Sequence, residues 1–327
     1  MTAAVSRTWR RLALLLALFA STSASAGAGA DMTAEQWLAA MSQAMRSLNY
    51  EGELIYQHDK GLKVLHLIHT VRQGRERERL ISLNGVPREV IRDEDSVRCI
   101  LPDSQAISVD RRAGSFGFTS LQPLVAEKLS GVYRFSVGEE ARVAGRQVRS
   151  IDIQPQDAYR YGHRLYLDMQ HHLPLKQELL DTQGNPVGLI MYSRIKIDPA
   201  LPFEASGAGP NSKSYSLIEY GPRQEMNGQG SDIWHLTQLP PGFAVNHRDF
   251  RDDEQGVRRE HLVLSDGLAS VSLYIEPAQA SAGLSGASHR GAVSVFGRQH
   301  QGYQILVVGE VPELTARFIA EAVEIKP

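Results

Sequence analysis

The sequence predicts a mainly β protein of the α+β class, built from two domains. Most apolar runs are short and alternate with polar residues, as half-buried strands of an antiparallel sheet do, and turns rich in Gly, Pro and Asp separate them. The sequence lacks the regular alternation of strands and helices that would indicate a parallel sheet. Residues 204–214, EASGAGPNSKS, have the composition of a flexible linker and mark the boundary between the domains.

Residues 1–26 have the features of a secretory signal peptide. A segment with three arginines precedes the apolar run Leu12–Ala20, which is shorter than the roughly 20 residues that span a bilayer. Small residues follow, and signal peptidase favours such residues at its cleavage site. We expect cleavage after Ala26, with Ala28 and Ala30 as alternatives. No cysteine stands directly after any of these positions to carry a lipid, so we expect an exported chain that is soluble in the periplasm.

The first domain, residues 31–203, is expected to begin with a helix. Thr33 and Gln36 have the spacing of a capping box, and apolar residues then recur at helical spacing up to Leu48. A short helix is also expected over residues 122–129, behind Pro123. The expected strands of this domain cover residues 53–57, 62–71, 79–83, 86–92, 97–101, 132–137, 147–153, 164–168, 175–180 and 187–197.

Three local patterns in this domain give sharper expectations. Asn84-Gly85 predicts a type I′ hairpin turn, with positive φ at both residues. The alternating charges of residues 75–79, RERER, indicate a solvated edge strand. In the last strand, alternation predicts a single dry face. That face holds Val187, Leu189, Met191, Ile195 and Ile197, and the opposite face holds Ile190, Tyr192, Arg194 and Lys196.

The second domain, residues 215–327, is expected to be a smaller antiparallel sheet with one helix. Pro312 suits the start of that helix, whose apolar side includes Leu314, Phe318 and Ile319. Residues 277–291 are expected to form a mobile loop. The expected strands cover residues 216–220, 233–236, 261–264, 270–275, 292–298 and 303–310.

Composition and motifs exclude several classes of function. With 35 basic and 37 acidic residues, the chain has a net charge of −2 and no overall positive field that would attract nucleic acid. Cys99 is the only cysteine, which excludes an internal disulfide and C-x-x-C sites. We expect it to pack as a small buried apolar residue. Nucleotide-binding glycine motifs, hydrolase elbows and metal-binding histidine patterns are absent from the sequence. The sequence therefore predicts a protein that is not an enzyme and has no cofactor or metal.

Several segments together resemble the MucB/RseB family of periplasmic sigma-factor regulators. They follow the family's order through both domains, and their specificity lies in the combination rather than in any single motif. The segments are YEGELIY at 50–56, ERLISLNGVPREVIRD at 78–93, VAGRQVRSIDIQPQDAYRYGHRLYLD at 143–168, LPPGF at 239–243, SDGLASVSLYIEP at 265–277 and VVGEVP at 307–312.

This resemblance implies both a fold and a function. The first domain is expected to be an open antiparallel half-barrel with covering helices, similar to the lipoprotein carriers LolA and LolB. The protein is expected to bind the periplasmic part of a single-pass anti-sigma factor of the MucA/RseA type and to shield it from regulated proteolysis. Lipid, lipopolysaccharide or the acyl chains of mislocalised lipoprotein are expected to release it. A periplasmic lipid or lipoprotein carrier is the alternative, and a hydrolase comes third.

A curved sheet with an incompletely covered apolar face offers a groove for acyl chains. Candidate residues for this groove are Trp37, Met41, Tyr56, Tyr133 and Phe135. For the partner, aromatic residues of the second domain are candidates, because such residues dominate binding hot spots. These are Trp234, Phe243, Phe250 and Tyr274. Ordinary core packing is the competing interpretation for each of the nine, and homo-oligomerisation is left open.

Overall fold

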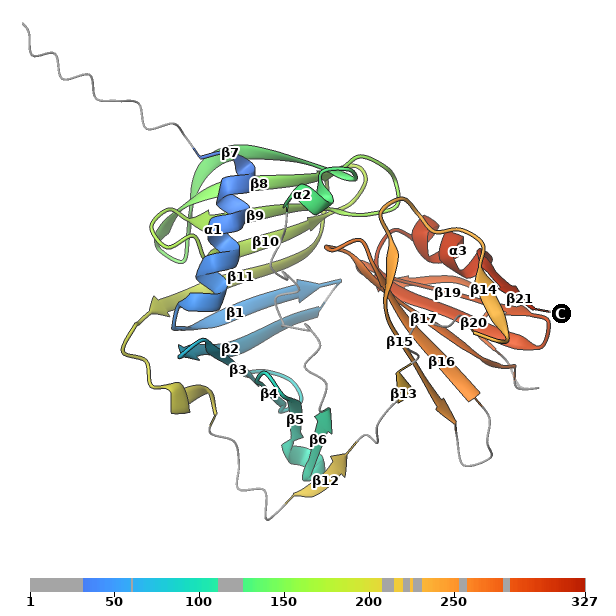
Figure 1. Ribbon diagram of the computed structural model, residues 1–327. Helices are drawn as coiled ribbons and strands as arrows, with labels where there is room; N and C mark the ends of the chain where they lie inside the picture. The colour runs from blue at the N-terminus through green and yellow to red at the C-terminus, as the bar shows by residue number, and fades with distance from the viewer. Residues whose placement is uncertain are drawn as a thin grey trace, which may run out of the picture. The chain divides into compact units, whose positions relative to one another are not determined.

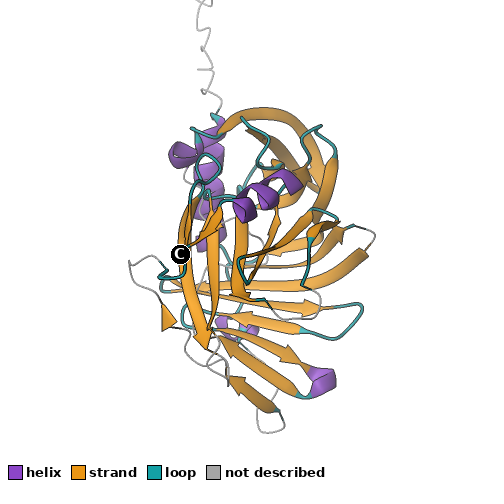
Figure 2. Ribbon diagram, turned by 90° about the vertical axis from the view of Figure 1, so that its right-hand side faces the viewer, coloured by secondary structure: helices purple, strands orange, loops and turns teal. Residues whose placement is uncertain are grey.

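The structure is a computed structural model that describes residues 32–59, 61–110, 126–207, 215–219, 224–225, 231–252, 258–278 and 283–326. The expected signal peptide with its cleavage sites lies outside these residues, as does most of the expected linker. None of the helices within these ranges is long and apolar enough to cross a membrane. Strands make up most of the described fold, and helices are few (Figure 2), which confirms the predicted mainly β class.

The first sheet contains twelve strands among the described residues. Their bounds are Tyr50–His58 (β1), Gly61–Arg72 (β2), Arg75–Ser82 (β3), Glu89–Arg92 (β4), Val97–Leu101 (β5), Ala106–Asp110 (β6), Tyr133–Val143 (β7), Arg146–Pro155 (β8), Gly162–Asp168 (β9), Pro174–Leu180 (β10), Pro186–Ile197 (β11) and Ser216–Glu219 (β12). Their order is β12-β6-β5-β4-β3-β2-β1-β11-β10-β9-β8-β7. Two antiparallel meanders, β1–β6 and β7–β11, are thus joined where β1 pairs with β11 (Figure 1).

Helix α1 (Ala34–Ser47) lies across one face of this sheet (Figure 1). The predicted capping box is confirmed: the Gln36 amide donates to Thr33 Oγ1, and the Thr33 amide donates to Gln36 Oε1. Ala44 and Met45 of the helix belong to the same hydrophobic core as Leu54 of β1 and Leu65 of β2. The other helices described up to residue 207 are short. They are η1 (Pro102–Ser104), α2 (Ala126–Leu129) and η2 (Phe203–Ser206).

The second domain is a sheet of seven strands, within the described ranges, with a helix on one face. The strands are β13 (Gln224–Glu225), β15 (Ala244–Asp252), β16 (Arg258–Ser265), β17 (Ser270–Pro277), β20 (Tyr303–Glu310), β19 (Val293–His300) and β18 (Gly286–Arg290), in spatial order. Helix α3 (Glu313–Glu321) packs on β19 and β20, and Ile319 joins Val307 in the core. A separate pair is formed by β14 (Trp234–Leu236) and β21 (Val323–Ile325).

Strand β3 corrects the expectation for the RERER segment. The strand pairs with β2 along its whole length, but with β4 only from Glu78 to Ile81, so residues 75–77 are paired on one side and the second half of the segment on both. Glu78 points to the α1 face and is buried, and Arg92 Nη2 lies 3.7 Å from its carboxylate. Across the strands, Tyr50, His69, Glu78 and Arg92 are successive register partners. The expected edge is therefore wrong for Glu78 and Arg79, where Glu78 belongs to a buried polar row, and not for residues 75–77.

The expected hairpin is present, since β3 pairs with β4, but its turn at Asn84-Gly85 is not of type I′. Gly85 has φ of 72°, but Asn84 is absent from the positive-φ residues of the described chain. Instead, Asn84 Oδ1 accepts from the Val64 amide at 2.7 Å, and its Nδ2 donates to the Leu62 carbonyl at 3.1 Å. The side chain thus closes a wider turn by bonding to the neighbouring strand.

The prediction of which side chains share a face of the last strand, β11, is wrong because the strand contains a bulge. Glu53 pairs with Arg194 but Leu54 pairs with Tyr192, so Ser193 is an extra residue. The bulge reverses the alternation. As a result, Tyr192 and Ile195 both contribute to the core on the α1 face, although the sequence assigns them to opposite faces.

Two segments expected to be irregular are partly ordered. Residues 204–206 of the expected linker belong to η2, and the Oγ atoms of Thr70 and buried Ser206 lie 2.5 Å apart. Part of the expected loop 277–291 forms the edge strand β18. Strand β12, expected in the second domain, instead pairs in parallel with β6 of the first sheet.

Candidate functional site

The face of the first sheet that carries α1 is the first candidate surface. Directly paired residues share a face of a sheet, and Tyr56 and Ile190 pack against the core that contains Ala44 of α1. The register extends this row through Gln177, Leu165 and Ile151 to Val137. The next row holds His58, Gly188, Leu179, His163, Ile153 and Phe135. We call these two rows, together with Tyr133 and α1, the inner face.

The inner face brings together all five residues predicted to contact lipid, but it exposes only some of them. Trp37, Met41 and Tyr133 are 7%, 0% and 1% exposed and pack as core. Tyr56 and Phe135 are half-buried and keep accessible surface. Val137 is 41% exposed. Apolar groups near Val137, Phe135 and Tyr56 are thus the accessible part of this face.

A buried histidine lies within the inner face. His163 of β9 is surrounded by apolar neighbours, and burial lowers its pKa to about 4. Gln177 Nε2 lies 3.2 Å from His163 Nδ1. At this distance the amide can donate to Nδ1 of a neutral imidazole. Sequence reasoning did not single out this residue, since nothing in its local spacing indicates burial.

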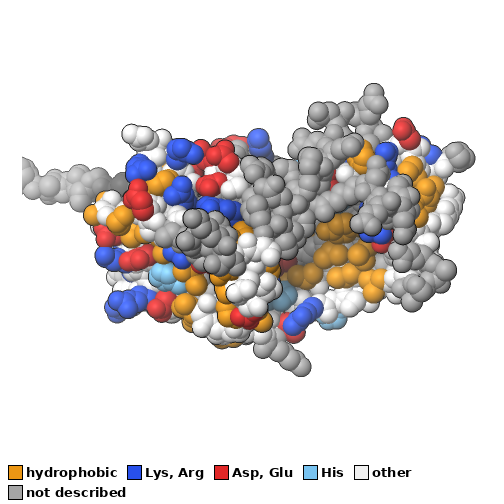
Figure 3. Space-filling view, turned by 90° about the horizontal axis from the view of Figure 1, so that it is seen from below, with side chains coloured by type: hydrophobic (Ala, Val, Ile, Leu, Met, Phe, Trp, Pro, Cys, Tyr) orange, Lys and Arg blue, Asp and Glu red, His pale blue; other side chains and the backbone are white. Residues whose placement is uncertain are grey.

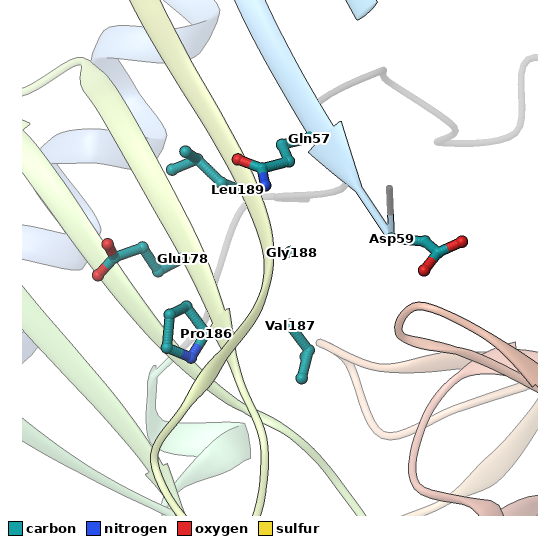
Figure 4. A pocket seen from close by; sticks show the side chains of 7 residues that line it. All are labelled: Gln57, Asp59, Glu178, Pro186, Val187, Gly188 and Leu189. Carbon is teal, nitrogen blue, oxygen red and sulfur yellow. The ribbon is translucent and has the colours of Figure 1, made fainter. Parts of the chain in front are cut away.

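One pocket opens on the other face of the same strands (Figure 4). Its volume is about 190 Å³, and Gln57, Leu189 and Glu178 are register partners across β1, β11 and β10. Lys176 Nζ lies 2.7 Å from the Glu178 carboxylate, which also accepts from the Tyr166 hydroxyl. This volume is below the roughly 300–1,000 Å³ of typical small-molecule sites. The lining residues are Gln57, Asp59, Glu178, Pro186, Val187, Gly188 and Leu189.

The loop between β8 and β9 forms the second candidate site, where the two domains touch. Arg160 of this loop is completely buried, and its Nη1 donates to Asp266 Oδ2 at 2.6 Å. Its Nη2 donates to the Pro241 carbonyl at 2.5 Å. Asp157 of the same loop accepts from Nε and Nη2, both at 3.0 Å. The guanidinium therefore bonds to both domains, and we call this arrangement the Arg160 junction.

The residue before Arg160 contacts helix α3. Thr315 Oγ1 donates to the carbonyl of Tyr159 at 2.5 Å, and the rings of Tyr159 and Phe318 meet edge to face with centroids 5.3 Å apart. Three segments that carry the family resemblance thus converge here. They are the 143–168 segment, LPPGF at 239–243 and SDGLA at the start of 265–277.

The four predicted partner-binding residues have different surroundings. Phe243 is 6% exposed and lies 5.3 Å from the Arg160 guanidinium, so it belongs to the junction. Trp234 is 3% exposed and packs in the second core. Phe250 is half-buried beneath the guanidinium of Arg258, at 4.3 Å. Tyr274 is 40% exposed and stacks on His261, with centroids 4.5 Å apart.

Surface charge and possible metal ligands complete the description of the candidate sites. Basic and acidic side chains are mixed on the face seen in Figure 3, where hydrophobic side chains also gather in one area. Within the described ranges, no group of three or more His, Cys, Asp or Glu residues could hold a metal ion. Cys99 is a free thiol and is half-buried, rather than fully buried as expected.

A large, mostly antiparallel open sheet with accessible apolar side chains on β1 and β7, joined through a buried arginine to a sheet-and-helix domain, defines a two-domain binding protein. The model of the MucB/RseB N-terminal domain matches residues 33–209, and that of the MucB/RseB C-terminal domain matches residues 228–324. The chain belongs to the MucB/RseB family.

Curated relatives and solved structures agree with this assignment. The chain is 29% identical to the sigma factor AlgU regulatory protein MucB of Pseudomonas aeruginosa, covering 95% of this chain and 96% of the relative. It is 27% identical to the sigma-E factor regulatory protein RseB of Haemophilus influenzae, covering 96% and 97%. A structure of the Pseudomonas aeruginosa MucA/MucB complex matches with a TM-score of 0.71 and 27% identity, over 90% of this chain and 99% of that chain. A crystal structure of MucB in complex with MucA(peri) matches with a TM-score of 0.69, 25% identity and the same coverage. These relatives are named as regulatory proteins, which confirms the prediction that the protein is not an enzyme.

Proposed function

We propose that this protein is a periplasmic negative regulator of sigma-factor activity. It binds the periplasmic part of a single-pass anti-sigma factor of the MucA/RseA type and protects that segment from regulated proteolysis. The observation that carries the proposal is the likeness, over both domains, to MucB chains crystallised with MucA. Export by the signal peptide at residues 1–26 is part of the proposal, because the regulator and the segment it binds must share a compartment.

The partner surface is proposed to include the outer face of the second sheet. Alternation along β16, β17 and β20 places Val263, Tyr274, Leu306 and Val308 on the side away from the core residues Leu273 and Val307. Tyr274 is exposed, and the three aliphatic residues are half-buried. Phe250 remains a second candidate. Trp234 and Phe243 are buried, so we assign them to the fold and not to the partner surface.

The release signal is proposed to be lipid, lipopolysaccharide or lipoprotein acyl chains that bind at the inner face. Tyr56, Phe135 and Val137 supply accessible apolar surface there. Release then requires only that the lipid prefer a conformation with low affinity for the anti-sigma factor. We keep residues 31–203 as the lipid-sensing domain, 204–214 as the linker and 215–327 as the partner-binding domain, and assign β12 structurally to the first sheet.

Titration calorimetry tests the partner proposal. The mature chain is mixed at micromolar concentration with the purified periplasmic segment of a MucA-like anti-sigma factor, and cleavage of that segment by its regulatory protease is followed in parallel. We expect complex formation and slowed cleavage. Replacing Tyr274 by Ala should weaken binding about tenfold, in the range of a moderate hot spot. The control Leu314→Ala changes an exposed residue of α3, 48% accessible, and should bind normally. Absence of a complex at micromolar concentration would refute the proposal.

The accessible inner face favours one alternative, a periplasmic lipid or lipoprotein carrier. A carrier must transfer its cargo, whereas a sensor need only bind it. Incubation with a fluorescent lipoprotein and two populations of vesicles separates the two functions. Net transfer from one population to the other supports the carrier, and binding without transfer supports the regulator.

A further inference from the structure

We infer that Arg160 is a latch between the two domains, and that Asp266 couples this latch to the inner face through Tyr133. The coupling follows from the contacts among Arg160, Asp266 and Tyr133. Its meaning as a release mechanism rests on the proposed function.

A single carboxylate oxygen links the three residues. Oδ2 of Asp266, in the turn between β16 and β17, accepts from Arg160 Nη1 at 2.6 Å and from the Tyr133 hydroxyl at 3.0 Å. The other oxygen, Oδ1, accepts from the amides of Leu268 and Ala269 at 2.9 and 2.7 Å. Asp266 thus holds the turn of the second domain with one oxygen and the first domain with the other.

The latch is dry and closely packed. The side chains of Arg160 and Asp266 are both 0% exposed, so an ion pair that loses one partner leaves an uncompensated buried charge. The rings of Tyr133 and Phe243 lie 5.4 and 5.3 Å from the guanidinium. Gly242 has φ of 79°, and a Cβ there would come within 2.9 Å of Val132 Cγ1 and 3.5 Å of Arg160 Nη1. Little space is left for water to replace a lost partner.

Tyr133 connects this latch to the surface where lipid is proposed to bind. It lies two residues before Phe135 on β7, so both side chains point to the inner face. Among the described strands, β7 lies at the edge of the first sheet and pairs with β8 alone. A chain that enters beside Phe135 and displaces Tyr133 removes one donor from a buried carboxylate. A hydrogen bond to a charged group changes an equilibrium by roughly tenfold to a hundredfold.

Distance measurements between the domains test the latch without any anti-sigma factor. In a Cys99→Ser background, spin labels are placed at the exposed positions Gln170 and Glu321, one in each domain. We expect a narrow distance distribution for the parent protein and a broad one for Arg160→Met. Loss of a buried partner should shift the equilibrium between joined and separated domains by roughly a hundredfold or more. The matched control is Arg164→Met. It breaks an ion pair of the same 2.6 Å length, with Asp152, that lies wholly within the first sheet.

The coupling is tested with micelles of myristoyl lysophosphatidylglycerol. We expect the micelles to broaden the distribution of the parent protein and to leave that of Tyr133→Phe unchanged, because the variant has no hydroxyl bond to lose. If Arg160→Met does not fold, as judged by circular dichroism, Asp266→Asn replaces it, since the amide can still accept from Leu268 and Ala269.

The outcomes separate the latch, the coupling and the proposed function. A narrow distribution for a folded latch variant overturns the latch. The coupling is overturned if micelles leave the distance distribution of the parent protein unchanged. It is also overturned if they broaden that of Tyr133→Phe as much as that of the parent. Failure of the anti-sigma factor to bind in the calorimetric test refutes the proposed function but leaves these distances as they are.

Discussion

The indole Nε1 of Trp234 donates a hydrogen bond to Glu260 Oε2 at 2.9 Å, and both side chains are buried. Glu260 also accepts from Ser231 Oγ at 2.8 Å and from Arg248 Nη2 at 3.2 Å, while the Arg248 guanidinium lies 4.6 Å from the indole ring. These bonds join the small β14–β21 pair to β16 of the seven-stranded sheet. Trp234 is therefore a structural residue of the second domain.

Removing the shared acceptor should destabilise the second domain strongly. Glu260→Ala leaves the donors of Trp234, Ser231 and Arg248 without their buried carboxylate, and breaking such a pair costs about 3–5 kcal/mol. We expect a loss of that size in the free energy of unfolding, measured by urea titration. The control Glu276→Ala removes a carboxylate that is 45% exposed and lies 3.3 Å from Arg259, so it should cost under about 1 kcal/mol. Equal losses in the two variants would contradict this role for Glu260.

Met41 should likewise act as core and not as a lipid contact. It is 0% exposed on the buried side of α1, and truncation of a fully buried Met to Ala costs about 2–5 kcal/mol because a cavity remains. Met41→Ala should therefore lower the urea midpoint, whereas Met169→Ala, at a position 36% exposed, should hardly change it. If Met41→Ala keeps full stability but loses amphiphile binding, the residue belongs to the binding surface after all.

Local sequence patterns predicted most helices and strands, but not which strands pair with one another. The capping box of Thr33 and Gln36 depends on residues three positions apart, so the sequence alone identifies it. The position of β3 inside the sheet depends on β2 and β4, and no charge pattern within β3 reveals that pairing. The bulge at Ser193 is equally hidden, since one extra residue reverses every side chain that follows.

The Arg160 junction shows the same limit at the candidate site. In sequence, the loop that carries Arg160 is a polar turn, and its partner Asp266 lies 106 positions further along the chain. Residue type alone indicates the aromatic candidates Phe243 and Tyr133, but it does not indicate which groups surround them. Only the packing shows that both rings lie against Arg160.

Two variants, one on the inner face and one away from it, should differ in their affinity for lipid. Tyr56 and Phe135 are half-buried on this face, so a Tyr56→Ala, Phe135→Ala double variant removes accessible apolar area. We expect its affinity for myristoyl lysophosphatidylglycerol to fall by about tenfold, from the loss of about 1–2 kcal/mol of apolar burial. Tyr274→Ala, in the second domain, should bind the amphiphile normally. Tryptophan fluorescence measures both, and equal affinities would place the lipid elsewhere.

His163 should make the first domain less stable in mild acid. Burial lowers the pKa of its imidazole from 6.5 to about 4, so between these two pH values the unfolded chain binds a proton that the folded chain excludes. Stability contributed by the neutral ring is fully present above pH 6.5 and falls as the pH decreases towards 4, by at most about 3 kcal/mol.

Urea titrations at several pH values check this expectation against a variant without the imidazole. His163→Met keeps an apolar side chain of similar size and should show a flatter pH dependence than the parent protein between pH 6.5 and 4. The control His289→Gln, at an exposed position of β18, should follow the parent curve. Because carboxylates titrate in the same way in all three proteins, the difference between the curves isolates His163. A His163→Met curve parallel to that of the parent would show that the ring is protonated in the folded state as easily as in the unfolded chain.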